Sequence, residues 1–341
     1  MKLIILVCCL VLILLAGLIT SCQLTASDIS SQQQTVPVAV KTLSISPTQS
    51  ALDHPLPTST VVSDSVEIFA TPMETVTPAP SLTSMPTFTP TPDTRPDPRQ
   101  WAGWPVIPTV SGRAKRIYQD GLSNGNDPKS VSVVGDCQSE PNVFLGIYAT
   151  DRYFLGDNYQ YLQETIDYYR ESFSRQSFGV RDGLSAPSAL SSLWADPQNC
   201  QPGETPVTCE LRAHKPAIMF INLGTNWKPG ASAKAYEDYL RQIVEQVIAN
   251  GTLPILSTKA DNIEGDHSLN LATARVAYDY DIPLWNFWLA ADSLPNHGLD
   301  ANRENIYLTP EGWDRRNFTA LQTLDAIRRA LNGLPPPTNL P

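Results

Sequence analysis

The stretch that decides the fold is KSVSVVGDCQS, which runs from Lys129 to Ser139. Its valines predict a short buried strand, and Gly135 then permits a sharp turn that a side chain would hinder. Open α/β sheets bind ligands outside the carboxyl ends of their strands, so a residue at such a strand end faces a cleft. Cys137 is therefore the candidate reactive residue, and an inert buried cysteine is the alternative.

The segments that follow alternate between helical and strand patterns, which is typical of a parallel α/β sheet with helices on both faces. The last helix begins with Thr309 as N-cap and Pro310 in its first turn, and it runs to about Leu331. Further strands are expected at 177–181, 216–223, 252–257 and 282–288. Further helices are expected at 112–121, 158–175, 186–194, 232–250 (with Tyr239 facing inward) and 268–280.

Four segments, taken in order, resemble the sequence blocks of the SGNH/GDSL hydrolases. Gly135-Asp136-Cys137 is similar to the Gly-Asp-Ser of block I, with cysteine in place of the nucleophilic serine. Gly183 in VRDGLSA resembles the block II glycine, Gly224-Thr225-Asn226 the Gly-x-Asn of block III, and LTPEG at 308–312 the tail of block V. The resemblance covers roughly residues 129 to 331 and implies a three-layer, flavodoxin-like α/β/α fold with about five parallel strands.

The resemblance also implies an oxyanion hole, which is a set of donors aimed at the charge that develops on a carbonyl oxygen. Its donors would be the backbone N–H groups of Cys137 and Gly183 and the side-chain amide of Asn226. Block V departs from the family pattern. The family has Asp-x-x-His, whereas this chain has ENIY at 304–307, which puts Tyr307 in the histidine position. A phenol with a pKa near 10 is a poor general base at neutral pH.

Another histidine could replace the missing base. We select His297, because it lies in the loop after the last expected strand, from which the family histidine comes. Asp300 or Glu304 would be its orienting carboxylate. The alternative is an ordinary solvent-exposed loop histidine.

The N-terminus predicts export. Residues 1–21 contain one lysine followed by an almost unbroken apolar run, which is typical of a secretory signal peptide. The end of this run, ITSC, resembles the bacterial lipobox, in which the cysteine, here Cys22, is acylated and becomes the new N-terminus. An uncleaved transmembrane anchor is the alternative. In either case we expect the protein outside the cell, held on the outer face of the membrane.

Residues 22–100 predict an extended, disordered tether. Fourteen of the 30 prolines lie in the first 110 residues, among Ser and Thr with little charge. One folded domain is expected over residues 101–335. The segment WAGWPVIP, at 101–108, is expected to pack onto that domain, with a carbohydrate-stacking platform as the alternative.

The cysteines divide by location. Of the six, Cys8 and Cys9 leave with the signal peptide and Cys22 takes lipid. In an oxidising compartment Cys200 and Cys209 then form the natural disulfide, and Cys137 stays free.

Charge and motif content exclude several classes of function. The net charge is −10 and the folded part has no Lys/Arg cluster, which argues against nucleic acid as a partner. No His/Cys cluster with metal-ligand spacing and no nucleotide motif is present, so no cofactor is expected.

Two functions remain open. The first is a carboxylic-ester hydrolase that uses Cys137 on cell-wall or extracellular glycans or lipids. An acylated small molecule is a further possible substrate. The second is a degenerate SGNH-type domain that keeps the pocket and binds a glycan or a partner. The loss of both the serine and the histidine favours the second, because each is essential to the ordinary mechanism.

Overall fold

The computed structural model describes residues 93–304 and 306–337, which belong to one compact unit. The expected signal peptide, with Cys8, Cys9 and Cys22, and the part of the expected tether up to residue 92 lie outside the described residues. Packing begins before the expected boundary at Trp101. Arg95 already stacks its guanidinium 4.0 Å from the centre of the Tyr278 ring and donates a hydrogen bond to the Tyr278 carbonyl at 2.6 Å.

Within the described residues, four parallel strands form one sheet in the order β1-β2-β3-β4. They are β1 (Asp127–Gly135), β2 (Pro216–Asn222), β3 (Leu253–Ser257) and β4 (Leu284–Trp285). Every residue of β2 and β3 is buried, as expected for central strands covered on both faces. The expected α/β class with a parallel sheet is confirmed.

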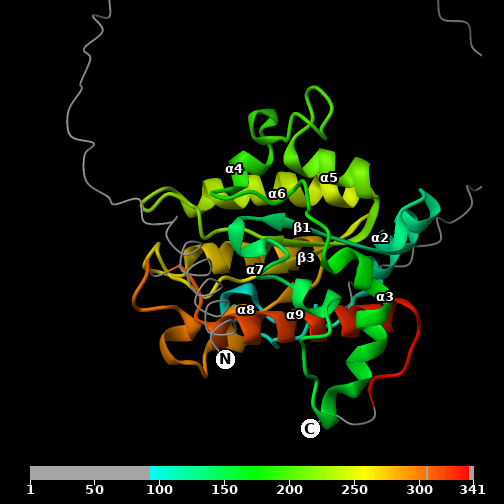
Figure 1. Ribbon diagram of the computed structural model, residues 1–341. Helices are drawn as coiled ribbons and strands as arrows, with labels where there is room; N and C mark the ends of the chain where they lie inside the picture. The colour runs from blue at the N-terminus through cyan, green and yellow to red at the C-terminus, as the bar shows by residue number, and fades with distance from the viewer. Residues whose placement is uncertain (1–92, 305, 338–341) are drawn as a thin grey trace, which may run out of the picture. The chain divides into compact units, whose positions relative to one another are not determined.

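Helices cover both faces of this sheet. Figure 1 shows the sheet edge-on, with α4, α5 and α6 on one side and α3, α8 and α9 on the other. The helices are α2 (Gly112–Ser123), α3 (Gln163–Phe173), α4 (Ala186–Ala189), α5 (Pro206–His214), α6 (Ala233–Ala249), α7 (Ser268–Tyr280), α8 (Phe287–Ala291) and α9 (Pro310–Leu331). As predicted, α9 begins at a Thr309 cap, whose side chain accepts a hydrogen bond from the Gly312 N–H.

Several expected elements are shorter than predicted. The strand expected at 177–181 is a single bridge, in which Val180 pairs with Gly135 beside β1. The strand expected at 282–288 ends at Trp285, because Asn286 caps a new helix, α8, by accepting from the Leu289 N–H. The helix expected at 158–175 is α3 preceded by the 3-10 turn η4 (Asp157–Leu162). The helix expected at 186–194 is α4 followed by the turn η5 (Ser192–Trp194).

Two further expectations concern side chains. Tyr239 is 36% exposed, so its inward placement was wrong, whereas the other expected inward residues of α6 are buried. Trp101 does pack onto the domain. Its ring centre lies 5.1 Å from that of Trp288, and its carbonyl accepts a hydrogen bond from Asn286.

Candidate functional site

The turn after β1 presents Cys137 at the carboxyl edge of the sheet. Cys137 is the first residue of the 3-10 turn η2 (Cys137–Ser139), which Asp136 caps by accepting from the Gln138 N–H at 3.0 Å. Gly135 has to be glycine here, because an added Cβ would lie 2.3 Å from Ser139 Oγ and 2.9 Å from the Asn222 carbonyl oxygen. The close packing around Gly135 therefore fixes where the thiol lies.

Negative charge surrounds that thiol. Cys137 is a free, half-buried cysteine. Burial, a hydrogen bond to Asp182, and the carboxylates of Asp136, Asp182 and Glu140 raise its pKa to about 12. All of these influences oppose the thiolate, which is the nucleophilic form of cysteine.

Asn226 meets the same turn from the loop after β2. Its Nδ2 donates a hydrogen bond to Asp136 Oδ2 at 2.9 Å, and Gly224 permits this loop by adopting a φ of +119°. Asp136 is 5% exposed. Burial raises its pKa to about 6, against the lowering effect of the Arg316 charge. One amide N–H of the expected oxyanion-hole donor is thus held by a carboxylate.

Gly183 lies in the loop beyond the Val180 bridge. It adopts a φ of +71°, a conformation that favours glycine. The Arg181 N–H donates to the Gly135 carbonyl at 3.2 Å, which holds this loop against the end of β1. Asp182, directly before Gly183, is the residue that hydrogen-bonds the Cys137 thiol. The structure therefore brings the loops of Cys137, Gly183 and Asn226 together.

Tyr307 lies in a loop that is anchored to the same turn. Gln138 Nε2 donates a hydrogen bond to the carbonyl of Ile306 at 3.0 Å. The Tyr307 ring itself packs beneath the guanidinium of Arg303, whose Cζ lies 3.7 Å from the ring centre. This is a cation–π contact, in which the face of the Tyr307 ring attracts the positive charge of Arg303.

His297 lies farther along the carboxyl edge. Its ring centre is 4.9 Å from that of Trp288, and its Nε2 is 3.8 Å from Asp292 Oδ1. The carboxylate within ion-pair distance is therefore Asp292, rather than Asp300 or Glu304. His297 lines a surface hollow together with His267 and Asn262, and its contacts are with this hollow and with Trp288.

Three residues of the site were not predicted from the sequence. Arg316 of α9 is 6% exposed and donates from Nη1 to the Gln138 carbonyl. Lys259, after β3, is 7% exposed and lies 2.5 Å from Asp261 and 2.6 Å from Glu264. Buried cations are rare, and composition alone does not locate them. Asp182 could have been found, because it adjoins Gly183, which was selected from the sequence.

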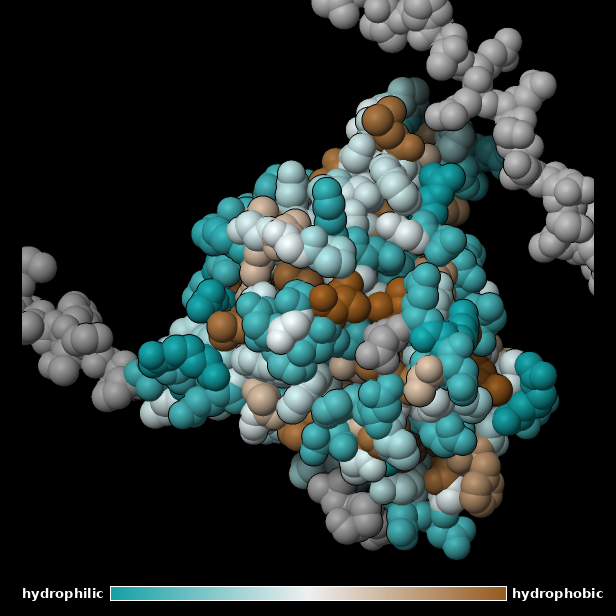
Figure 2. Space-filling model, turned by 90° about the vertical axis from the view of Figure 1, so that its left-hand side faces the viewer, coloured by the Kyte–Doolittle hydropathy of each residue, from teal (hydrophilic) through white to brown (hydrophobic). Residues whose placement is uncertain are grey.

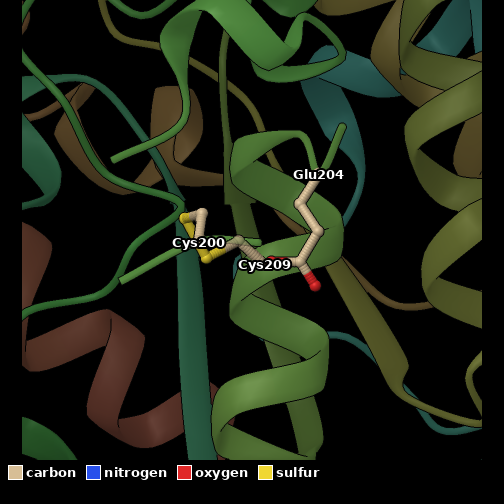
Figure 3. Close-up of side chains that lie close together, drawn as sticks. All are labelled: Cys200, Glu204 and Cys209. Carbon is tan, nitrogen blue, oxygen red and sulfur yellow. A yellow bond between two sulfur atoms is a disulfide. The ribbon is translucent and has the colours of Figure 1, made fainter. Parts of the chain in front are cut away.

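The predicted disulfide between Cys200 and Cys209 is confirmed, with a Cα–Cα distance of 5.3 Å (Figure 3). These cysteines and Glu204 are the one group of three metal-ligand side chains that come within 4.8 Å of one another in the described part of the chain. The disulfide occupies both sulfurs, so they are not free to bind metal.

The carboxyl ends of the strands lie on the left of Figure 1, and Figure 2 looks onto that side. The surface there is largely hydrophilic, with apolar patches near its middle. Over residues 93–304 and 306–337, no helix is both long and apolar enough to cross a membrane.

No family model and no curated protein matches this sequence. Solved structures that resemble it include a GDSL-like lipase from Bacteroides thetaiotaomicron, at 15% identity, covering 67% of this chain and 99% of that one, with a TM-score of 0.38. An esterase from a Pseudoalteromonas species has 15% identity, coverages of 60% and 99%, and a TM-score of 0.39. An acetylxylan esterase from Geobacillus stearothermophilus has 14% identity, coverages of 59% and 94%, and a TM-score of 0.37.

Proposed function

We propose that this chain is a lipid-anchored, extracytoplasmic protein with a degenerate SGNH-hydrolase-like domain. The domain binds a cell-wall glycan or an acylated small molecule at the carboxyl edge of its sheet, with little or no hydrolysis. The sequence blocks around Cys137, Gly183 and Asn226 support the pocket, and the N-terminal leader and tether support the location.

The observation that best supports a loss of hydrolysis is the environment of the Cys137 thiol. A nucleophilic thiol is activated by a neighbouring base or by positive charge. Here the groups that act on it are carboxylates, and they raise its pKa to about 12. At pH 7 a thiol with such a pKa is ionised in roughly one molecule in 100,000.

The alternative, an ester hydrolase that uses Cys137, depends on a relocated base. His297 packs against Trp288 and approaches Asp292. Its described contacts are therefore with these residues and not with the Cys137 thiol. This alternative would require the imidazole to move onto Cys137.

The rate of ester turnover distinguishes the degenerate binding domain from the ester hydrolase. Purified protein should hydrolyse aryl acetates far more slowly than the roughly 10 per second of ordinary enzymes, and Cys137→Ala should not change the rate. Turnover near 10 per second that is lost in both Cys137→Ala and His297→Ala would establish the alternative.

Ligand binding is tested on isolated, O-acetylated cell-wall glycan. The intact chain should sediment with the glycan, and Asn226→Ala should weaken binding because its amide faces the pocket turn. Gln242→Ala is the matched amide control, since Gln242 lies exposed on α6. Equal binding by Asn226→Ala and wild type would place the ligand elsewhere.

A further inference from the structure

A small cavity with a mixed polar and apolar lining lies beside the Cys137 turn, between the carboxyl ends of β1, β2 and β3 and helix α9. The space open to the centres of water molecules is about 40 Å³. Its polar lining includes Asp136, Asn222, Thr225, Lys259, Asp261 and Arg316.

Two opposite charges flank the cavity without forming an ion pair. Asp136 and Arg316 are 5% and 6% exposed, and among the described residues no carboxylate comes within 4.0 Å of the Arg316 guanidinium. The hydrogen bond that Arg316 makes is from Nη1 to the Gln138 carbonyl. Its remaining N–H groups need acceptors, because a buried charge is stable only when it is paired and hydrogen-bonded.

Asn222 adds an orphan acceptor to the same cavity. This residue is 8% exposed, and its Oδ1 is buried without a hydrogen-bond partner in the described part of the chain. Its Nδ2 makes a long contact of 3.4 Å with Ser139 Oγ. Buried polar atoms are almost always hydrogen-bonded to protein or to ordered water, so a donor is expected in the cavity.

The other cation in the lining has its partners already. Lys259 Nζ lies 2.5 Å from Asp261 and 2.6 Å from Glu264, and Thr225 donates to the second oxygen of Asp261 at 2.9 Å. In the described part of the chain the unmet requirement is therefore that of Asn222 Oδ1, which needs a donor, and it lies in one cavity with the Arg316 guanidinium, which can donate to a bridging molecule.

Size and charge then select the ligand. Arg316 opposes a metal cation, and Asp136 opposes an anion. The ligand must be neutral, it must both donate and accept, and it must fit a space that holds about three water molecules.

We propose that this cavity is a bound-water site, in which ordered water bridges Asn222 Oδ1 and the Arg316 guanidinium to the Asp136 carboxylate. The site makes Asp136 a positioning residue: the bridge to Arg316 favours the ionised carboxylate, which accepts from the Asn226 amide at 2.9 Å. It acts in this way whether or not the domain hydrolyses esters.

A crystal structure of the protein at a resolution that shows ordered solvent is the first test. Water within hydrogen-bond distance of both Asn222 Oδ1 and the Arg316 guanidinium is expected. A dry cavity, or an Asn222 Oδ1 that is bonded directly to a protein donor, would overturn the proposal.

The titration of Asp136, followed by carboxyl ¹³C NMR and assigned with Asp136→Asn, is the second test. The charged groups that act on Asp136 are Arg316 of α9, Asp261 after β3 and Asp182 beyond the Val180 bridge. Asn222→Leu, which is close to isosteric, removes the orphan acceptor. It should displace the water and raise the proton affinity of Asp136 by about tenfold, as expected for the loss of a hydrogen bond to a charged group.

Ser257→Ala is the matched control. Ser257 lines the same cavity, but its hydroxyl is already used, since it donates to the Thr258 carbonyl at 2.9 Å. This variant should keep both the water and the wild-type titration. If Asp136 titrates in the Asn222→Leu variant as it does in the Ser257→Ala variant, the positioning role of the water is refuted.

Discussion

The side chains around Cys137 carry negative charge, whereas acyl-transfer nucleophiles need a base or a positive field. Asp182 accepts a hydrogen bond from the protonated thiol, and Asp136 and Glu140 add to the repulsion of a thiolate. A serine at this position would be less affected, because a hydroxyl attacks as its proton leaves to a base rather than as a preformed anion.

This difference between thiol and hydroxyl predicts what happens when the serine, aspartate and histidine of the SGNH pattern are introduced. Cys137→Ser combined with Tyr307→His and Glu304→Asp should raise aryl-acetate turnover by more than either Cys137→Ser or Tyr307→His alone, because nucleophile and base act as a unit. Steady-state kinetics on the two single variants and the triple variant provide the measurement. A triple variant that is no faster than wild type would show that the loop of Tyr307 cannot bring an imidazole to residue 137.

Among the elements, α5 is tied to β1 through one fully buried carboxylate, Glu210. Arg175 Nη1 lies 2.8 Å and His214 Nδ1 2.9 Å from its oxygens, the Phe178 N–H donates to it at 2.7 Å, and Ser132 Oγ also donates to it. Burial acts to raise the pKa of Glu210, but these partners outweigh burial and lower it from 4.5 to about 2.

Stability should therefore depend on Glu210 in a pH-dependent way. The folded-state pKa lies below the unfolded one, so the stabilisation is complete above pH 4.5 and is lost as pH falls toward 2. At pH 7, Glu210→Gln should lower the free energy of unfolding by about 3 kcal/mol in urea titrations, because it leaves a half-buried arginine without its partner. The deficit should shrink at low pH.

Asp238→Asn is the control for Glu210→Gln. Asp238 pairs with Lys234 on the exposed face of α6, and such pairs contribute little to stability. A Glu210→Gln variant as stable as Asp238→Asn would show that the buried network does not hold α5.

The elements also show where sequence patterns suffice. The valines of β1, the almost wholly apolar PAIMFIN of β2 and the Thr309-Pro310 start of α9 are strong local signals, and each produced an element where one was expected. The apolar run at 282–288 was wrongly predicted to be one strand, because Asn286 starts a helix within it. Helix α5 was missed, because a Pro/Gly/Thr-rich loop leads directly into its Thr205 cap.

The candidate site was predictable in part for a similar reason. Cys137, Gly183 and Asn226 each follow a sheet segment, so the parallel topology alone brings their loops to one edge. Arg316 and the hydrogen bond from Asn226 to Asp136 depend on how α9 and the loops pack in three dimensions, and no periodicity or spacing encodes them. His297 remains a prediction as a relocated base.

For the whole molecule, the leader predicts membrane attachment. The mature N-terminus should be Cys22 carrying acyl chains, because ITSC closes the apolar run of the signal. Mass spectrometry of protein extracted from membranes should find the diacylated Cys22 peptide, and Cys22→Ala should release the protein from the membrane fraction. Mature protein that still begins at Met1 would contradict this account.

A domain that binds without hydrolysing esters requires that the Cys137 thiol stay protonated at neutral pH. The rate of alkylation of Cys137 by iodoacetamide as a function of pH measures this most directly, on a variant that begins at Asp93, in which Cys137 is the free cysteine. We predict a negligible rate at pH 7 that still rises above pH 10, toward a midpoint near the pKa of about 12. Rapid alkylation at pH 7, with a midpoint at or below the ordinary thiol value of about 8.5, would contradict the account.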